Sequence, residues 1–192
     1  MNTIDIINNH ISDHINTIKD IHKNNESKIE KISKILSSCL SNNGTIYWCG
    51  NGGSAADSQH LAAELVGRFK EDRPALRSVS LTTDSSVLTC IANDYSYDNI
   101  FSRQIEALGR KGDVLVAIST SGNSANIISA LQTARKLKVD TISLLGKDGG
   151  KAADLSDTSL VIDSLSTARI QESHILIGHI LCDLIERELG LV

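Results

Sequence analysis

Residues 45–67, TIYWCGNGGSAADSQHLAAELVG, carry the clearest indication of the architecture of this 192-residue chain. A short apolar run, Thr45–Cys49, leads into a glycine-rich turn, and Ser54–Gly67 then follows a pattern typical of a helix. A buried strand, a tight turn and a helix in direct succession form the repeating unit of a parallel sheet that helices cover on both faces.

The same alternation continues to the C-terminus. Four further apolar runs predict strands, and the segments between them predict helices. The predicted strands are Ser78–Leu81, Val114–Ile118, Thr141–Leu145 and Ser159–Ile162, and the predicted helices lie near Ser86–Ala92, Asn99–Leu108, Ser124–Leu137, Lys151–Leu155 and Arg169–Leu189. We therefore expect an α/β fold with three layers, α/β/α, around a parallel sheet.

The first 40 residues form a helical region of a different kind. Isoleucines recur three or four positions apart from Ile4 to Ile21, the pattern weakens at Asn24 and Asn25, and it resumes at Ile29. The spacing predicts two helices, or one helix with a break. The apolar stripe packs either on its own domain or on another subunit, and a long apolar helix ahead of a compact α/β unit favours the second. We interpret residues 1–41 as a segment for oligomerisation and residues 42–192 as the α/β domain.

Composition excludes several classes of function. The net charge of -4 provides no global basic field for nucleic acid. No segment approaches the roughly 20 apolar residues of a membrane span, and Met1–Asp20 lacks the pattern of a signal peptide. The four cysteines show no paired spacing. We expect a cytoplasmic protein with reduced thiols that binds neither nucleic acid nor membrane.

Two junctions between a strand and a helix are suited to binding phosphate. Cys49–Ser54 is rich in glycine, and Ser119–Ser124 contains four hydroxyl residues within six positions. In an open α/β sheet such loops lie where ligands bind, and each precedes a helix whose first N–H groups lack intrahelical partners. The alternative is a tight turn with a capping residue, and Ser54 with Asp57 resembles a capping box. Two such loops in one domain favour phosphate.

The helix after the first loop carries His60 and Glu64, which are four residues apart and therefore share one face. Small and apolar neighbours predict that the pair is partly buried, and a partly buried carboxylate is suited to act as a general base. The alternative is a surface pair at ordinary helical spacing.

The last helix adds four polar side chains to an otherwise apolar pattern, Gln171, Glu172, His174 and His179. Gln171 and His179 diverge by about 80° around the helix and lie about 12 Å apart along it. They share a site only through long side chains, a bent helix start or a neighbouring subunit. His174 points elsewhere, and we interpret it as a structural or surface histidine. Together, His60, Glu64, Gln171 and His179 form a candidate site for a divalent metal, although glutamine is an unusual zinc ligand.

An ordered series of motifs between residues 45 and 190 resembles the phosphoheptose isomerase family of the sugar isomerase (SIS) fold. The motifs are C-G-N-G-G-S, D-S-Q-H-L-A-A-E-L, A-N-D, I-S-T-S-G-N-S, G-K-D-G-G-K and R-I-Q-E-S-H-I-L-I-G-H. The resemblance implies a five-stranded, flavodoxin-like parallel sheet and a homotetramer with active sites at subunit interfaces.

The resemblance also implies the roles of individual residues. Glu64 and His179 match the catalytic acid/base pair, and the four candidate metal ligands match a zinc site. The residues implied to bind substrate are Asn51, Gly52, Gly53, Glu64, Asn93, Asp94, Ser119, Thr120, Ser121, Ser124 and Gln171. Ala168 departs from the family pattern, because many members carry an acidic residue there, and this departure bears on the shape of the pocket.

The activity implied by the resemblance is conversion of sedoheptulose 7-phosphate to D-glycero-D-manno-heptose 7-phosphate through an enediol(ate). This reaction is the first step of ADP/GDP-heptose precursor synthesis and is associated with lipopolysaccharide. The main alternative is a non-catalytic SIS protein that binds the bacterial replication initiator DnaA. That relative lacks the residues matching Glu64 and His179, both of which are present here. A sugar-phosphate-sensing SIS module and an isomerase of pentose or hexose phosphates are further alternatives.

Overall fold

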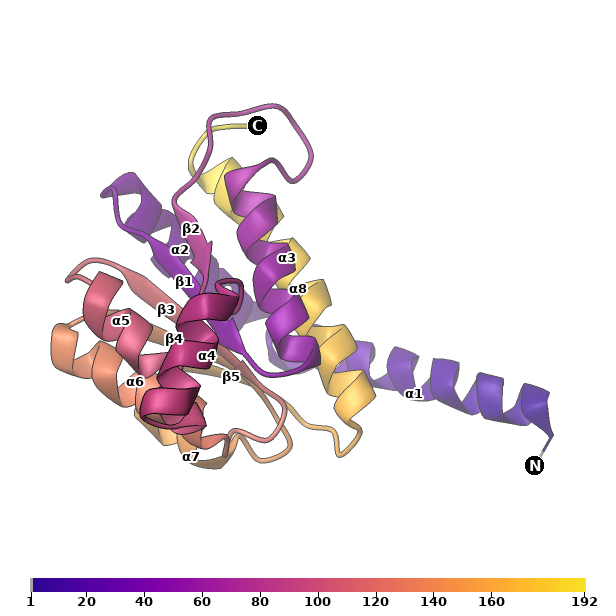
Figure 1. Ribbon diagram of the computed structural model, residues 1–192. Coiled ribbons are helices and arrows are strands. Elements are labelled where there is room, and N and C mark those ends of the chain that lie inside the picture. Colours follow the sequence, from indigo (N-terminus) through magenta and orange to yellow (C-terminus); the bar gives the residue numbers. More distant parts are fainter. Residues whose placement is uncertain (1) are drawn as a thin grey trace.

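A computed structural model describes residues 2–192, and its centre is one sheet of five parallel strands in the order β2-β1-β3-β4-β5 (Figure 1). Each neighbouring pair of strands is parallel. The strands are β1 (Ile46–Gly50), β2 (Ser78–Ser80), β3 (Val114–Ser119), β4 (Asp140–Gly146) and β5 (Thr158–Ile162). All five predicted strands are present, with each end at or within one residue of the prediction.

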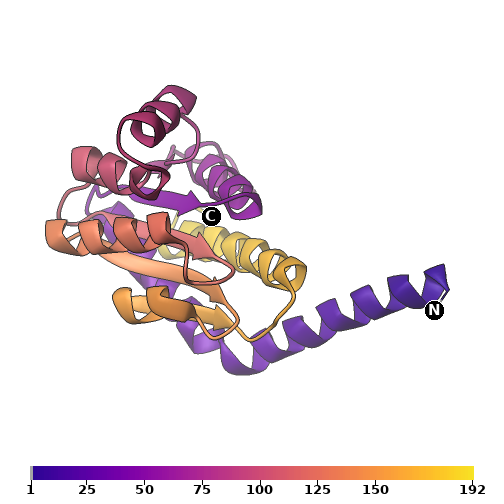
Figure 2. The ribbon, with the colours of Figure 1, turned by 60° about the horizontal axis from the view of Figure 1, so that its bottom comes forward.

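Helices cover both faces of this sheet. Two separate apolar cores lie between the sheet and the helices, one on each face. On one face pack α2 (Glu26–Ser41), α3 (Gly53–Val66) and α8 (Thr167–Glu188), and on the other pack α4 (Ser85–Asp94), α5 (Ser102–Leu108), α6 (Ala125–Leu137) and α7 (Gly150–Leu155) (Figure 2). The three-layer α/β/α arrangement predicted from the sequence is confirmed.

The inner strand β1, which lies between β2 and β3, shows why the apolar runs are continuous. Ile46 and Trp48 belong to the core on one face, while Tyr47 and Cys49 belong to the core on the other. Successive side chains of a strand point to opposite faces, so a strand covered on both sides must be apolar throughout. The indole N–H of Trp48 donates a hydrogen bond of 2.9 Å to Ser78 Oγ, which satisfies the polar atom of this fully buried ring.

One helix prediction is wrong in detail. Instead of a single helix over Asn99–Leu108, a short 3₁₀ turn, η1 (Tyr97–Asn99), precedes α5. The adjacent residues Ile100 and Phe101 between them are both buried. Consecutive side chains in a regular helix point about 100° apart, so the change in direction at this point allows both to reach the core.

The helix α1 (Thr3–Asn24) projects away from the rest of the molecule in both ribbon views (Figures 1 and 2). The predicted break is confirmed, because α2 begins after the buried Asn25. Arg169 of α8 holds the middle of α1 by donating a hydrogen bond of 2.6 Å to the carbonyl oxygen of His10. Five isoleucines of α1 are between 45% and 63% exposed, namely Ile4, Ile6, Ile7, Ile11 and Ile15.

Two sequence features have simple structural outcomes. Across residues 2–192, no helix is both long and apolar enough to cross a lipid bilayer. All four cysteines are free thiols, and three of them are buried.

Candidate active site

The helices α3 and α8 lie side by side and run in the same direction, which brings distant parts of the sequence together (Figure 1). Gly53 at the start of α3 lies against Gln171, and Leu61 two turns later lies against Gly178. A methyl group on Gly178 would lie 2.5 Å from Leu61 Cδ2, so a larger residue here would force the Leu61 side chain or the helices to shift.

Beside this contact, His60 and Glu64 of α3 meet His179 of α8. Nε2 of His60 lies 2.8 Å from Nε2 of His179 and 3.2 Å from Oε1 of Glu64. The potential ligand atoms of the three side chains all lie within 4.8 Å of one another. The His60 side chain is half exposed and that of Glu64 is mostly buried, so the cluster opens to solvent on one side. The partial burial expected for the pair is confirmed for Glu64 and is wrong for His60, which is exposed.

The cluster has the donor set of a catalytic zinc site. Two imidazoles and one carboxylate can hold zinc and leave a fourth position for water or substrate. The phenyl ring of Phe69 stacks on the His179 imidazole with a centroid separation of 5.5 Å and an interplanar angle of 22°. Phe69 was not predictable from the sequence, because the irregular segment after α3 has no periodic pattern to place its side chains.

Gln171 lies apart from this cluster within the chain. Its side-chain amide packs against Gly53, which precedes His60 by seven residues or about 10 Å along α3. The helix α8 is continuous through Gln171 and His179. The single chain therefore does not bring Gln171 into the His60 cluster. Ala168 is exposed in the first turn of α8.

His174 is a structural histidine in the core. The residue is fully buried, and its Nε2 lies 3.0 Å from the carbonyl oxygen of Leu145. Burial lowers the pKa of His174 to about 4, so the imidazole is neutral at physiological pH.

The glycine-rich loop leads directly into α3, but its cap differs from the expectation. The helix begins at Gly53 with Gly52 as its N-cap residue, in a backbone conformation with φ of +57°. The capping box suggested for Ser54 and Asp57 is wrong, and within residues 2–192 no side chain caps this helix. Burial raises the pKa of the Asp57 carboxyl, whose Oδ2 atom has no hydrogen-bond partner in the described chain. Ser54 N and Ala55 N already donate hydrogen bonds of 3.0 Å to the carbonyl oxygens of Asn51 and Gly52, so the turn itself uses these N–H groups of α3.

The hydroxyl-rich loop between β3 and α6 is held in shape by its own side chains. Ser119 Oγ accepts a hydrogen bond of 3.1 Å from Gly122 N, and Ser121 Oγ accepts one of 3.2 Å from Asn123 N. Ser124 occupies the N-cap position of α6, yet its hydroxyl makes no capping bond with any residue from 2 to 192. Ser124 and its neighbour Thr120 are only partly buried. This loop therefore presents hydroxyl groups together with a helix N-terminus.

A reciprocal amide pair joins the two loops. Asn51 Nδ2 donates a hydrogen bond of 2.9 Å to Asn126 Oδ1, and Asn126 Nδ2 donates one of 2.8 Å to Asn51 Oδ1. The Tyr97 hydroxyl donates to the same oxygen of Asn51 at 3.0 Å. The sequence analysis identified Asn51 and overlooked Asn126 and Tyr97. The signal was available for Asn126, a polar residue in the first turn of a predicted helix directly after the phosphate loop.

A cavity of about 230 Å³ lies beside Asn51 and Gly52 and extends to Thr89 and Ala92 of α4. The predicted substrate ligands Asn93 and Asp94 follow in the last turn of α4 and are exposed. Asn93 Nδ2 donates a hydrogen bond of 2.8 Å to Asp94 Oδ1. The end of α4 and the glycine-rich loop are thus neighbours, and no contact joins Asn93 or Asp94 to the His60 cluster among the described residues.

Comparison with known proteins agrees with this geometry. The family model of the SIS domain matches residues 9–146. A phosphoheptose isomerase from Sulfurimonas denitrificans is 56% identical over 163 residues, which are 85% of this chain and 84% of the relative. This chain belongs to the phosphoheptose isomerase family. Two solved structures of phosphoheptose isomerases are also similar: GmhA from Neisseria gonorrhoeae, with a TM-score of 0.92 and 44% identity, and the protein from Francisella tularensis, with 0.95 and 36%. Each comparison covers 97% of this chain and 100% of the other. Both the phosphoheptose isomerase resemblance and the SIS fold predicted from the sequence are confirmed.

Proposed function

We propose that this chain is an aldose–ketose isomerase that converts sedoheptulose 7-phosphate to D-glycero-D-manno-heptose 7-phosphate. The observation that carries the proposal is that Glu64 and His179, 115 positions apart in the sequence, both contact Nε2 of His60. Relatives named phosphoheptose isomerase, 50% to 58% identical over most of this chain, support the same activity.

The two loops at the carboxyl ends of β1 and β3 suit the phosphate of the substrate. Ser119, Thr120, Ser121 and Ser124 offer hydroxyl donors, and the start of α6 offers backbone N–H groups. Neutral donors and a helix N-terminus bind an anion without requiring a net positive charge on the protein. Holding the phosphate fixes one end of an open-chain sugar, so that its carbonyl end can reach the His60 cluster.

The isomerisation itself moves one proton between adjacent carbons. Glu64 acts as the base that removes the proton next to the carbonyl, which generates an enediol(ate), and delivers a proton to the neighbouring carbon after exchange with solvent. His179 acts as the acid that moves a proton between the two oxygens, or the two residues exchange these roles. Each group lies in a partly buried position with access to solvent, as proton carriers require.

The same cluster suits zinc as a cofactor. His60, Glu64 and His179 would hold the metal, which as a Lewis acid would stabilise negative charge developing on the sugar oxygens. Gln171 would join them only from a neighbouring subunit. The exposed isoleucines of α1 support such an assembly, and we propose a cytoplasmic homotetramer with sites shared between subunits.

Proton NMR in heavy water tests the activity directly. We would incubate the pure protein with sedoheptulose 7-phosphate, fructose 6-phosphate and ribulose 5-phosphate, and repeat each reaction after chelation. The enediol(ate) mechanism predicts conversion of the heptose phosphate with deuterium appearing at the carbon next to the carbonyl. Turnover of only the pentose or hexose phosphate would assign a different substrate. Binding of DnaA in a pull-down, with no turnover of any sugar, would favour the non-catalytic alternative.

The variant Glu64→Gln tests the base. We expect turnover to fall by about two to four orders of magnitude with the fold preserved. Glu106→Gln is a matched control, because Glu106 is an exposed glutamate on α5 whose one ion pair within residues 2–192 is with Arg103, at 3.7 Å. Near-normal turnover in Glu64→Gln would remove this residue from the mechanism.

A further inference from the structure

The loop between α3 and β2 contains an arginine that is buried as deeply as the apolar core. Arg73 and its partner Glu186 on α8 have side chains that are 1% and 0% exposed, and Arg73 Nε donates a hydrogen bond of 2.8 Å to Glu186 Oε1. Burying two charges is costly, and replacing such a pair by apolar residues is often neutral or stabilising. Stability alone is therefore a weak explanation for an ion pair at this position.

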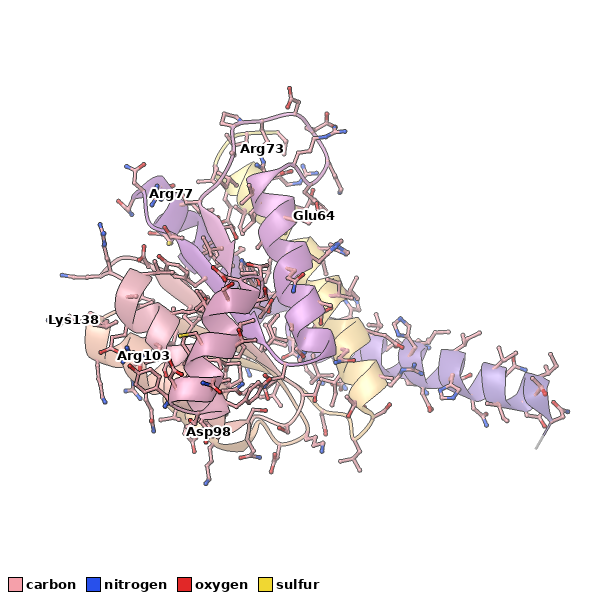
Figure 3. All side chains as sticks on the ribbon, in the orientation of Figure 1. Glu64, Arg73, Arg77, Asp98, Arg103 and Lys138 are labelled. Atoms are coloured by element: carbon pink, nitrogen blue, oxygen red, sulfur yellow. The ribbon has the colours of Figure 1, made fainter. Side chains whose placement is uncertain are left out.

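The guanidinium of Arg73 also completes the C-terminal end of α3. Its Nη2 donates a hydrogen bond of 2.8 Å to the carbonyl oxygen of Glu64, and its Nη1 donates one of 2.8 Å to the carbonyl oxygen of Leu65. These carbonyls belong to the last turn of the helix, where no intrahelical donor follows, and a cation is favoured there by the helix dipole. Figure 3 shows Glu64 projecting from this part of α3 and Arg73 in the loop above it. One planar group thus fixes the backbone that carries the proposed base.

The carboxylate of Glu186 makes a second link, to His179. Its Oε1 atom accepts a hydrogen bond of 3.2 Å from the backbone N–H of Phe69, and the Phe69 ring stacks on the His179 imidazole. The same oxygen therefore receives both Arg73 and Phe69. Glu64 and His179, on separate helices, are each connected to one buried ion pair.

We infer that Arg73 and Glu186 are positioning residues, which set the separation of Glu64 and His179 through the Glu64 carbonyl and the Phe69 ring. The inference rests on the proposed function. Neither residue touches the reacting atoms, so they act only through the two side chains that they place. Errors of about 1 Å in such placement can reduce turnover by about two orders of magnitude.

The first test is Arg73→Lys, with Arg77→Lys as its control. Lysine keeps the charge but cannot offer the forked donors that reach Glu186 and the carbonyls together. Arg77 lies in the same loop, and its Nε donates to Thr45 Oγ1 at 3.3 Å, away from the His60 cluster. We expect kcat of Arg73→Lys to fall about 10- to 100-fold with KM changed less than about threefold, because the phosphate loops lie elsewhere. Arg77→Lys should match the parent.

Phe69→Leu tests the second link and remains available if Arg73→Lys does not fold. The side chain is only partly buried, so leucine keeps the apolar contact while removing the stacked ring. We expect kcat to fall by about 10-fold at unchanged KM. The zinc affinity, measured by competition with a chromophoric chelator, should weaken about 10-fold in Arg73→Lys, as for other groups that orient metal ligands.

The outcomes separate this inference from the proposed function. If the parent protein isomerises no sugar phosphate, the proposed function fails, and zinc affinity still tests the positioning. NMR signals of the His60 and His179 rings provide a readout that needs neither substrate nor metal, and they should shift in Arg73→Lys but not in Arg77→Lys. Unchanged kcat, zinc affinity and ring signals in a folded Arg73→Lys protein would overturn the inference, as would the same result for Phe69→Leu.

Discussion

Adding one methyl group at Gly178 should separate the two helices that carry the candidate site. In Gly178→Ala the new Cβ would lie 2.5 Å from Leu61 Cδ2, 2.6 Å from Cδ1 and 3.0 Å from Cγ. Ordinary contacts between carbon atoms are about 3.5 Å, so the pair must move apart by about 1 Å. Leu61 is fully buried and is surrounded by core, which limits its freedom to rotate away.

The size of the effect follows from this geometry. Overpacking of a well-packed core costs about 1–3 kcal/mol, and for a chain of this length such a cost lowers Tm by about 2–12 °C. His179 follows Gly178 directly, so a shift of α8 also lengthens its 2.8 Å contact with His60. A displacement of about 1 Å at the reacting groups should reduce kcat by up to about 100-fold.

Thermal unfolding and isomerase kinetics of Gly178→Ala measure the two effects together. The double variant Leu61→Ala/Gly178→Ala is the control, because it removes the atoms with which the new methyl group collides. Leu61→Ala alone leaves a cavity and costs about 2–5 kcal/mol, but the double variant should be less destabilised than the sum of the single variants by about 0.5–3 kcal/mol. Additive losses, or a Gly178→Ala protein with parental Tm and kcat, would refute the close packing of α3 on α8.

Two further predictions concern stability and assembly. Burial lowers the pKa of His174 to about 4, so between that pH and the unfolded value near 6.5 the unfolded chain binds a proton that the folded chain does not. The contribution of His174 to the free energy of unfolding should therefore be greatest above pH 6.5 and should fall by roughly 3 kcal/mol at pH 4. Urea unfolding of His174→Gln should show a smaller loss of stability over this pH range. An equal loss would exclude this histidine as the cause. For assembly, the double variant Ile7→Asp/Ile11→Asp should lower the mass of the particle measured by light scattering. The secondary structure measured by circular dichroism should stay unchanged, because both side chains are exposed in the single chain. An unchanged mass would show that α1 does not join subunits.

Much of the fold was predictable because β1, β3 and β4 are buried on both faces over nearly their whole length. A short, continuous apolar run such as Val114–Ile118 is typical of a strand in the interior of a covered sheet. The strand β3 covers the same residues and one more at its end. The break near Asn24 and Asn25 was also visible, because the isoleucine spacing is interrupted there. The separate turn η1 was not, since nothing in the sequence distinguishes it from the first turn of α5.

The candidate site was predictable as residues but not as a contact. Helical spacing placed His60 beside Glu64, whereas the approach of His179 depends on how α3 lies along α8. Gly178 was a local sign that another helix packs closely against α8, but a glycine alone does not indicate which helix. Within the chain the structure also places Gln171 about two turns of α3 away from His60, a distance that spacing within α8 could not reveal.

Arg73 shows a different reason for failure. It lies in an irregular segment next to Glu71 and Asp72, where a solvated arginine is the ordinary interpretation. Its partner offered a better sign, because Glu186 follows Cys182 by four residues on the apolar face of the last helix. A charged residue in such a stripe indicates a buried partner, but the sequence does not say which one.

Because all five strands are parallel, the loops that follow the strands and the turns that precede them lie at opposite edges of the sheet. One edge can therefore be modified without altering the other. The loops proposed to bind the sugar phosphate follow the strands, whereas the turn at Lys111 and Gly112, exposed in the single chain, precedes β3 and lies about 20 Å away along that strand. A fluorophore or a surface tether attached at Lys111 would therefore leave the opposite rim open. Immobilised or labelled protein could be followed during turnover without blocking the entry of its ligand.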